Sequence, residues 1–114
     1  MKNKNIVKSF QAAFSGFSYL YHNHKHLKIN LSIALIILFL SFISDIELIE
    51  LIIILLAIIL VFLTESINTS IEEICNLISP EYHPKIKIIK DLGSFFVLLA
   101  AIFSILVFIL IFLI

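Results

Sequence analysis

The sequence predicts an all-α integral membrane protein, with an amphipathic surface helix followed by three membrane-spanning helices. Composition is the first observation: 61% of the 114 residues are hydrophobic and only 14% are charged, too little polar surface to cover a soluble globule. The second is that the apolar residues gather in three long runs. The third is that the lysines avoid one of the two connections between those runs. Together these place one domain in a bilayer.

Three segments are expected to cross the membrane, at residues 29–45, 48–78 and 90–114. A bilayer core of roughly 30 Å needs about 20 helical residues, so the first run borrows from its flanks to span. The second is apolar to Leu63 and then continues with helical spacing until Pro80, which predicts a helix projecting beyond the bilayer. Helix is expected throughout because backbone amides in lipid must bond within their own segment.

The lysines predict the orientation of these segments. Five lysines precede the first run: Lys2, Lys4, Lys8, Lys25 and Lys28. Three more lie between the second and third runs, Lys85, Lys87 and Lys90, whereas the connection 44–50 has no lysine. The positive-inside rule therefore places the N-terminus in the cytoplasm and the C-terminus outside.

Eight lysines balance eight acidic residues, so no nucleic-acid partner is expected. Cys75 is the single cysteine and is expected to be a free thiol.

Residues 5–22 are expected to form the amphipathic surface helix. Its apolar residues recur at three- and four-residue spacing, typical of a helix lying on a membrane; they are Ile6, Val7, Phe10, Ala13, Phe14, Phe17 and Tyr21. Two interpretations stay open. The helix is either a surface anchor or one wall of an active site.

A polar face follows the apolar part of the second segment. With about 100° of turn per residue, five polar side chains fall within an arc of about 100°, namely Glu65, Asn68, Thr69, Glu72 and Asn76. The two carboxylates are two turns apart, roughly 10 Å, too far to share one ion. An ionisable group at the hydrocarbon edge is costly, so Glu65 is a candidate general base. Alternatively, the face is a solvated helix end.

Four motifs carry a resemblance to a known family: ESINTSIEEICN at 65–76, SPEYHP at 79–84, KDLGS at 90–94 and SFQAAFSGF at 9–17. Their order and separation resemble the prokaryotic diacylglycerol kinase and undecaprenol kinase family over nearly the whole chain. The resemblance implies a homotrimer in the bacterial cell (cytoplasmic or inner) membrane. It further implies transfer of the γ-phosphate of ATP to a lipid alcohol, with Mg²⁺, at a site between subunits near the membrane surface.

The resemblance also implies roles for individual residues. Glu65 is the base that takes the proton of the lipid hydroxyl, Glu72 binds the magnesium that bridges the ATP phosphates, and Asn68 helps to orient the reacting groups. The remaining implied contacts are to the nucleotide from Glu81, Tyr82, His83, Lys90 and Asp91, and to the lipid from Ser94.

Two positions depart from the family pattern. His24 stands where a second metal-linked glutamate is common, and a neutral imidazole is a poor magnesium ligand. Asn76 stands where an aspartate is usual. A transition-metal site at His22, His24 and His26 is disfavoured, because this spacing converges on one face only in a strand.

The leading hypothesis is therefore a lipid kinase, with undecaprenol or diacylglycerol as acceptor. SPEYHP resembles the undecaprenol kinases of Gram-positive bacteria more closely. The alternative is a catalytically impaired relative acting as a membrane-interaction or scaffold protein, which His24 motivates. An ion-conducting oligomer using Glu65 as relay is disfavoured, because the interiors of the first and third spans offer no ionisable partner.

Overall fold

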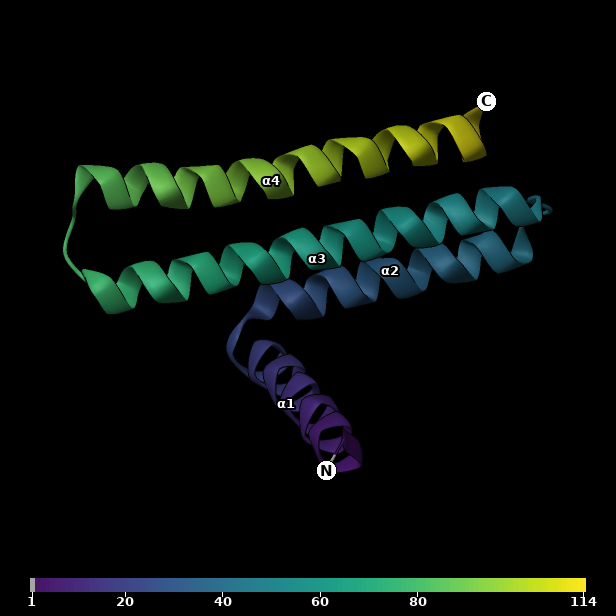
Figure 1. The fold of residues 1–114 in the computed structure, drawn as a ribbon. Coiled ribbons are helices and arrows are strands. Elements are labelled where there is room, and N and C mark those ends of the chain that lie inside the picture. The colour runs from purple at the N-terminus through teal and green to yellow at the C-terminus, as the bar shows by residue number, and fades with distance from the viewer. Residues whose placement is uncertain (1) are drawn as a thin grey trace. The chain divides into compact units, whose positions relative to one another are not determined.

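The computed structural model describes residues 2–114, with side chains from Asn5 onwards, so the side chains of the predicted cytoplasmic Lys2 and Lys4 lie outside the described residues. Over this range the chain is helical and contains no strand, which confirms the predicted all-α fold. The elements, drawn in Figure 1, are α1 (Lys2–Asn23), α2 (Lys25–Ile43), α3 (Leu48–Ile78), α4 (Pro84–Phe108) and the short π-helix η1 (Ile109–Leu113).

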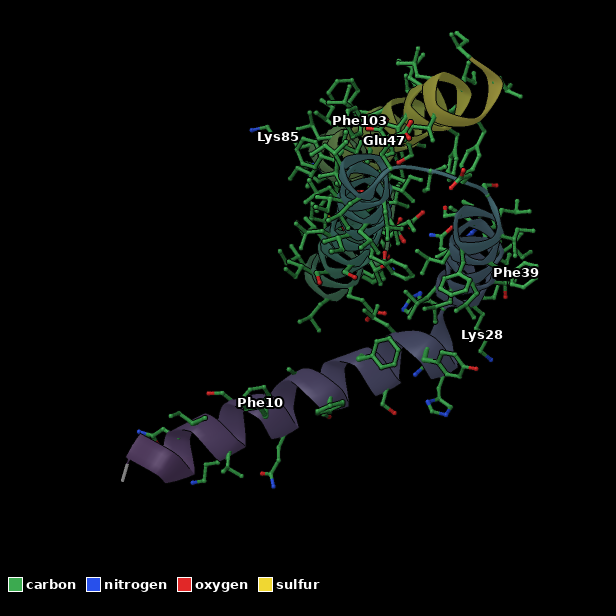
Figure 2. All side chains as sticks on the ribbon, turned by 90° about the vertical axis from the view of Figure 1, so that its right-hand side faces the viewer. Phe10, Lys28, Phe39, Glu47, Lys85 and Phe103 are labelled. Carbon is green, nitrogen blue, oxygen red and sulfur yellow. The ribbon has the colours of Figure 1, made fainter. Side chains whose placement is uncertain are left out.

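The chain divides into two compact units, one ending at Leu35 and the other running from Ile36 to Ile114. The first contains α1 and the beginning of α2. The large apolar side chains of α1 are exposed on the helix: Phe10, labelled in Figure 2, is 64% exposed and Phe14 is 72% exposed. An apolar face of this size without protein cover is suited to the membrane interface.

Helices α1 and α2 meet at His24, where the backbone leaves the helical path without a proline or glycine. The His24 N–H donates to Leu20 O at 3.0 Å, and the Leu27 N–H donates to His24 O at 3.3 Å. Backbone hydrogen bonds therefore continue on both sides of the bend. The Tyr19 and His24 rings also meet edge to face, with centroids 6.0 Å apart.

In the second unit, α3 and α4 pack side by side as an antiparallel pair (Figure 1). On α4 the buried residues Gly93, Ala100 and Val107 recur every seventh position, the spacing of a coiled-coil seam. On α3 the buried Ile54 and Ala57 are three residues apart, and the buried Cys75 follows Ile54 by three sevens, which fits the two positions per heptad of such a seam. Small residues at a helix contact let two backbones approach closely in a membrane, where packing replaces the hydrophobic effect.

Two contacts fix the register of this pair. The Ser104 hydroxyl lies 3.4 Å from Ala57 O while donating to Ala100 O at 2.9 Å, and Gly93 lies directly against Asn68. The number of residues from Ala57 to Asn68 equals the number from Gly93 to Ser104, so one register runs along both helices. It brings Ile54 level with Val107.

The ends of α3 and α4 are set by local chemistry. At the start of α3, Glu47 and Glu50 form a reciprocal capping box, with the Glu47 N–H donating to Glu50 Oε1 at 2.9 Å. Helix α3 ends at Ile78, two residues before Pro80, as predicted.

Pro84 requires a correction. The third segment was expected to begin at residue 90, whereas α4 begins six residues earlier, with Pro84 in its first turn. Proline is favoured there because its fixed φ suits the helix and no N–H is needed. The helix consequently begins upstream of the apolar run that starts near residue 90.

Three helices are long and apolar enough to cross a membrane in the described part of the chain: Lys25–Ile43, Leu48–Ile78 and Pro84–Leu113. Their mean hydropathies are 2.0, 2.8 and 3.3. Within the second unit, large side chains such as Phe39 and Phe103, labelled in Figure 2, are more than 40% exposed. Such surfaces suit a lipid environment rather than water.

Candidate functional site

The predicted polar face lies on one unbroken helix. Glu65, Asn68, Thr69 and Glu72 are half-buried on α3, and Asn76 is exposed. Neighbouring hydroxyls bond back to the helix: Ser66 Oγ donates to Phe62 O at 2.8 Å, and similar bonds occur at Thr64 and Ser70. Their hydrogen atoms are therefore engaged locally, and the carboxylates and amides carry the chemistry of this face.

Asn68 and Glu72 form a side-chain pair one turn apart. Asn68 Nδ2 donates to Glu72 Oε1 at 3.2 Å, which constrains the rotation of the carboxylate and leaves Oε2 available. Asn68 Oδ1 is buried and has no hydrogen-bond partner among the described residues. Buried amide oxygens are normally satisfied, so this atom marks a place where polar chemistry has been kept inside a helix contact.

Gly93 on α4 forms the opposite wall of this pair. A Cβ built on Gly93 would overlap Asn68 Oδ1 and would lie 3.3 Å from Asn68 Cγ and 3.5 Å from Ile71 Cδ1. Only a residue without a side chain fits here with Asn68 in its present position. The sequence interpretation named Asn68 but missed Gly93, although its seven-residue spacing from Ala100 was a usable signal.

Two lysines of α4 have different partners. Lys87 Nζ lies 2.6 Å from Asp91 Oδ2, in an exposed ion pair one turn along the helix. Lys90 Nζ instead donates to Asn76 Oδ1 of α3 at 2.8 Å. The Lys90 side chain is therefore bonded to a neutral amide rather than to a carboxylate, and it has two further N–H donors for an anion.

The other predicted site residues do not take part in the contact between Lys90 and Asn76. Glu81, Tyr82 and His83 are exposed in the connection between α3 and α4. The His83 ring nitrogen Nδ1 accepts from the Lys85 N–H at 3.1 Å and so caps α4, a role that the sequence did not suggest. Ser94 is exposed on α4. Lys85 projects away from the helix (Figure 2).

His24 belongs to the first unit, whereas the other named residues belong to the second. Its predicted role at a metal therefore remains a prediction. In the described part of the chain no three His, Cys, Asp or Glu side chains gather as a metal-binding group.

The model of the family described as prokaryotic diacylglycerol kinase matches residues 11–112. The chain belongs to this family. It is also 30% identical over 104 residues to a protein from Synechocystis sp. named diacylglycerol kinase, covering 90% of this chain and 59% of that protein. The chain thus spans about three-fifths of the length of this curated relative.

Membership of a kinase family suggests the use of ATP and a metal ion, and α3 offers carboxylate and amide oxygens of the kind that bind Mg²⁺. Mg²⁺ is usually held by one or two carboxylates together with substrate phosphates and water. The Glu72 carboxylate, oriented by Asn68, meets that requirement without a third acidic neighbour.

Proposed function

We propose that this chain is a lipid kinase that transfers the γ-phosphoryl group of ATP to a membrane lipid alcohol. The observation that carries this is the Asn68–Glu72 pair, held against α4 at the polar end of a membrane-type helix. The Lys90 ammonium lies on the neighbouring helix beside a neutral amide. Phosphoryl transfer depends mainly on positioning and on neutralising charge, which an oriented carboxylate and an ammonium group provide.

In this proposal Glu65 is the general base that accepts the proton of the lipid hydroxyl. It is half-buried and lies where the apolar run of α3 gives way to polar residues, so a lipid headgroup hydroxyl reaches it from the bilayer. Ser94 contacts the same lipid. Asn68 holds the reacting groups in line, one turn of α3 away from Glu65.

Glu72 would hold the magnesium of the nucleotide, Lys90 and Asp91 would contact the nucleotide, and Glu81, Tyr82 and His83 would line its pocket. Bound Mg²⁺ supplies charge neutralisation on the phosphate oxygens. The Lys87–Asp91 ion pair engages only Oδ2 of this carboxylate and is exposed, so a contact of Asp91 with the nucleotide costs little stability.

We further propose a homotrimer in the bacterial cytoplasmic membrane, with the N-terminus in the cytoplasm and the C-terminus outside. The lysine distribution supports this orientation. The trimer, and a site completed by a neighbouring subunit, rest on the resemblance to the family. In that assembly His24 takes the place of the family's second glutamate.

The acceptor is undecaprenol or diacylglycerol. The motif SPEYHP favours undecaprenol, whereas the Synechocystis relative carries the name diacylglycerol kinase. Purified protein in mixed micelles, supplied with Mg-ATP and each lipid in turn, should phosphorylate one of them in preference. A panel of long-chain alcohols, assayed under the same conditions, then ranks the acceptors by phosphorylation rate.

The mechanism is tested by Glu65→Gln, which keeps the side-chain size and removes the base. We expect activity to fall by roughly 10²–10⁴-fold, the usual contribution of general base catalysis. Glu73→Gln, an exposed position on the same helix, is the matched control and should retain activity. Equal rates for Glu65→Gln and the unmodified protein would exclude Glu65 as the base.

A second candidate is a non-catalytic relative that acts as a membrane-interaction or scaffold protein, and the observation favouring it is His24. Equilibrium dialysis with a labelled ATP analogue separates the two. A kinase binds the analogue in a Mg²⁺-dependent manner, whereas a scaffold relative shows no such binding at millimolar nucleotide.

A further inference from the structure

Gly93 is the one position of the α3–α4 contact at which a side chain is excluded by a polar neighbour. The residue is buried, and a Cβ there would overlap Asn68 Oδ1. Asn68 in turn donates from Nδ2 to Glu72 Oε1. A chain of contacts therefore runs from the backbone of α4 through one amide to the carboxylate on α3.

We propose that Gly93 is a positioning residue: its missing side chain admits the Asn68 amide into the helix contact, and the amide fixes the Glu72 carboxylate. This rests on the proposed function only in giving Glu72 the magnesium. Gly93 itself contacts neither substrate. It acts by setting how close α4 comes to the Asn68 side chain.

General close packing does not account for this glycine. Ala100 and Val107 occupy the equivalent seam positions at the next two levels of α4 and are buried with their side chains present. Glycine lowers helix stability relative to alanine. At the level of Asn68, alanine would be the better helix former, so the glycine has a local reason to be there.

The unsatisfied oxygen supplies that reason. Asn68 Oδ1 is buried without a partner among the described residues, and a side chain at position 93 would take the place where this oxygen lies. Displacing the amide would break or lengthen its 3.2 Å bond to Glu72 Oε1. The carboxylate would then rotate freely, which weakens a ligand that depends on orientation.

The test compares Gly93→Ala with Gly16→Ala. These are the only two glycines in the sequence, and among the described atoms a Cβ on Gly16 would meet nothing within 4 Å. Two measurements are made on each full-length variant in micelles. One is kinase rate against Mg²⁺ concentration, and the other is Mn²⁺ binding, followed by the paramagnetic signal of free Mn²⁺, with a non-hydrolysable ATP analogue present.

For Gly93→Ala we expect the half-saturating concentrations of Mg²⁺ and Mn²⁺ to rise about tenfold, and the maximal rate to fall roughly 10- to 100-fold, as for a displaced catalytic group. The KM for the lipid should stay unchanged. Gly16→Ala should match the unmodified protein. Identical metal affinity in Gly93→Ala and Gly16→Ala would overturn the proposal.

A double-mutant cycle with Asn68→Ala separates positioning from packing. Asn68→Ala removes the amide that a Cβ at position 93 would meet, so adding Gly93→Ala to it should change neither Mn²⁺ affinity nor Tm further. If Gly93→Ala alone fails to fold, the double variant should still fold. An equal loss in both backgrounds would mean that Gly93 serves the helix contact itself, and would refute the proposal.

The same measurements distinguish this inference from the proposed function. If the unmodified protein neither binds Mn²⁺–nucleotide nor phosphorylates lipid, the kinase proposal fails, while the Tm values of the cycle still report the coupling between Gly93 and Asn68. If the unmodified protein is active and the cycle shows no coupling, the positioning role alone fails.

Discussion

The two ends of the α3–α4 contact have the same register and different contents. We call Ile54, Ala57, Ala100 and Val107 the apolar seam, and Asn68, Asn76, Lys90 and Gly93 the polar seam. Every member of the apolar seam is at most 8% exposed. The polar seam instead holds an unsatisfied amide oxygen and an ammonium group in contact with the opposite helix. One packing pattern therefore serves two purposes.

The difference follows from what stabilises each end. Lipid tails are as apolar as leucine, so the apolar seam gains stability from close packing rather than from leaving water. The polar seam depends on hydrogen bonds, and a buried polar atom without a partner is costly. Substitutions that change side-chain volume are thus expected to be poorly tolerated in the apolar seam. Substitutions that change charge are expected to be poorly tolerated in the polar seam.

The largest effect is expected for Glu72→Gln. The amide keeps an oxygen that can accept from Asn68 Nδ2 but removes the negative charge. We expect kcat/KM to fall roughly 10²–10³-fold, the usual cost of removing one electrostatic contact to a transition state. Tm should change little, which is measured by thermal unfolding in micelles. A large loss of Tm would place Glu72 among the structural residues.

Next in size is Ile54→Ala in the apolar seam. Ile54 is fully buried, and in lipid the cost comes mainly from the cavity, so we expect about 2 kcal/mol of lost stability. The kinase rate of the folded fraction should be preserved. Denaturation in mixed micelles measures the loss of stability. The kinase rate divided by the amount of folded protein measures whether activity is preserved. An inactive but stable variant would contradict the division between the two seams.

Asn76→Asp should have a smaller effect, confined to the nucleotide. A carboxylate replacing the amide oxygen, now 2.8 Å from Lys90 Nζ, would neutralise the ammonium. The KM for ATP should rise about two- to fivefold, corresponding to a surface ion pair of ~0.5–1 kcal/mol, and the rise should diminish with added salt. An unchanged KM at every salt concentration would remove Lys90 from the nucleotide site.

The smallest effect is expected for Lys87→Ala. Its ion pair with Asp91 is exposed on both sides, and such pairs contribute little to stability. Tm should be unchanged within error in a thermal melt. A clear destabilisation would show that the start of α4 depends on this ion pair more than on Pro84 and the His83 cap.

Much of the fold could be predicted from residue pattern alone. The apolar runs and Pro80 predicted a helix at 48–78, and α3 has those bounds. The polar face followed from the same periodicity, because a single helix fixes the angles between its own residues. The start of α4 at Pro84 was missed, because a proline ends one helix or begins the next depending on its neighbours, here the cap from His83.

Contacts between helices were not predictable in the same way. The pairing of Lys90 with Asn76 and of Gly93 with Asn68 depends on the register of α3 against α4, which no spacing within one helix determines. Glu65 was a candidate base from its position at the hydrocarbon edge as well as from family resemblance, whereas the roles of Glu72 and Ser94 came from the resemblance alone. All three roles stay predictions. His24 lies in the other unit, so its part in the chemistry also stays a prediction.

The free Cys75 gives this protein a natural reporter. It is the only cysteine in the sequence, it is 3% exposed, and it follows Glu72 by less than one turn on the face that packs against α4. A thiol so placed reacts with a maleimide only when the two helices separate. The labelling rate of the unmodified chain therefore measures how often this helix pair opens, and protection by nucleotide would show that substrate binding closes it.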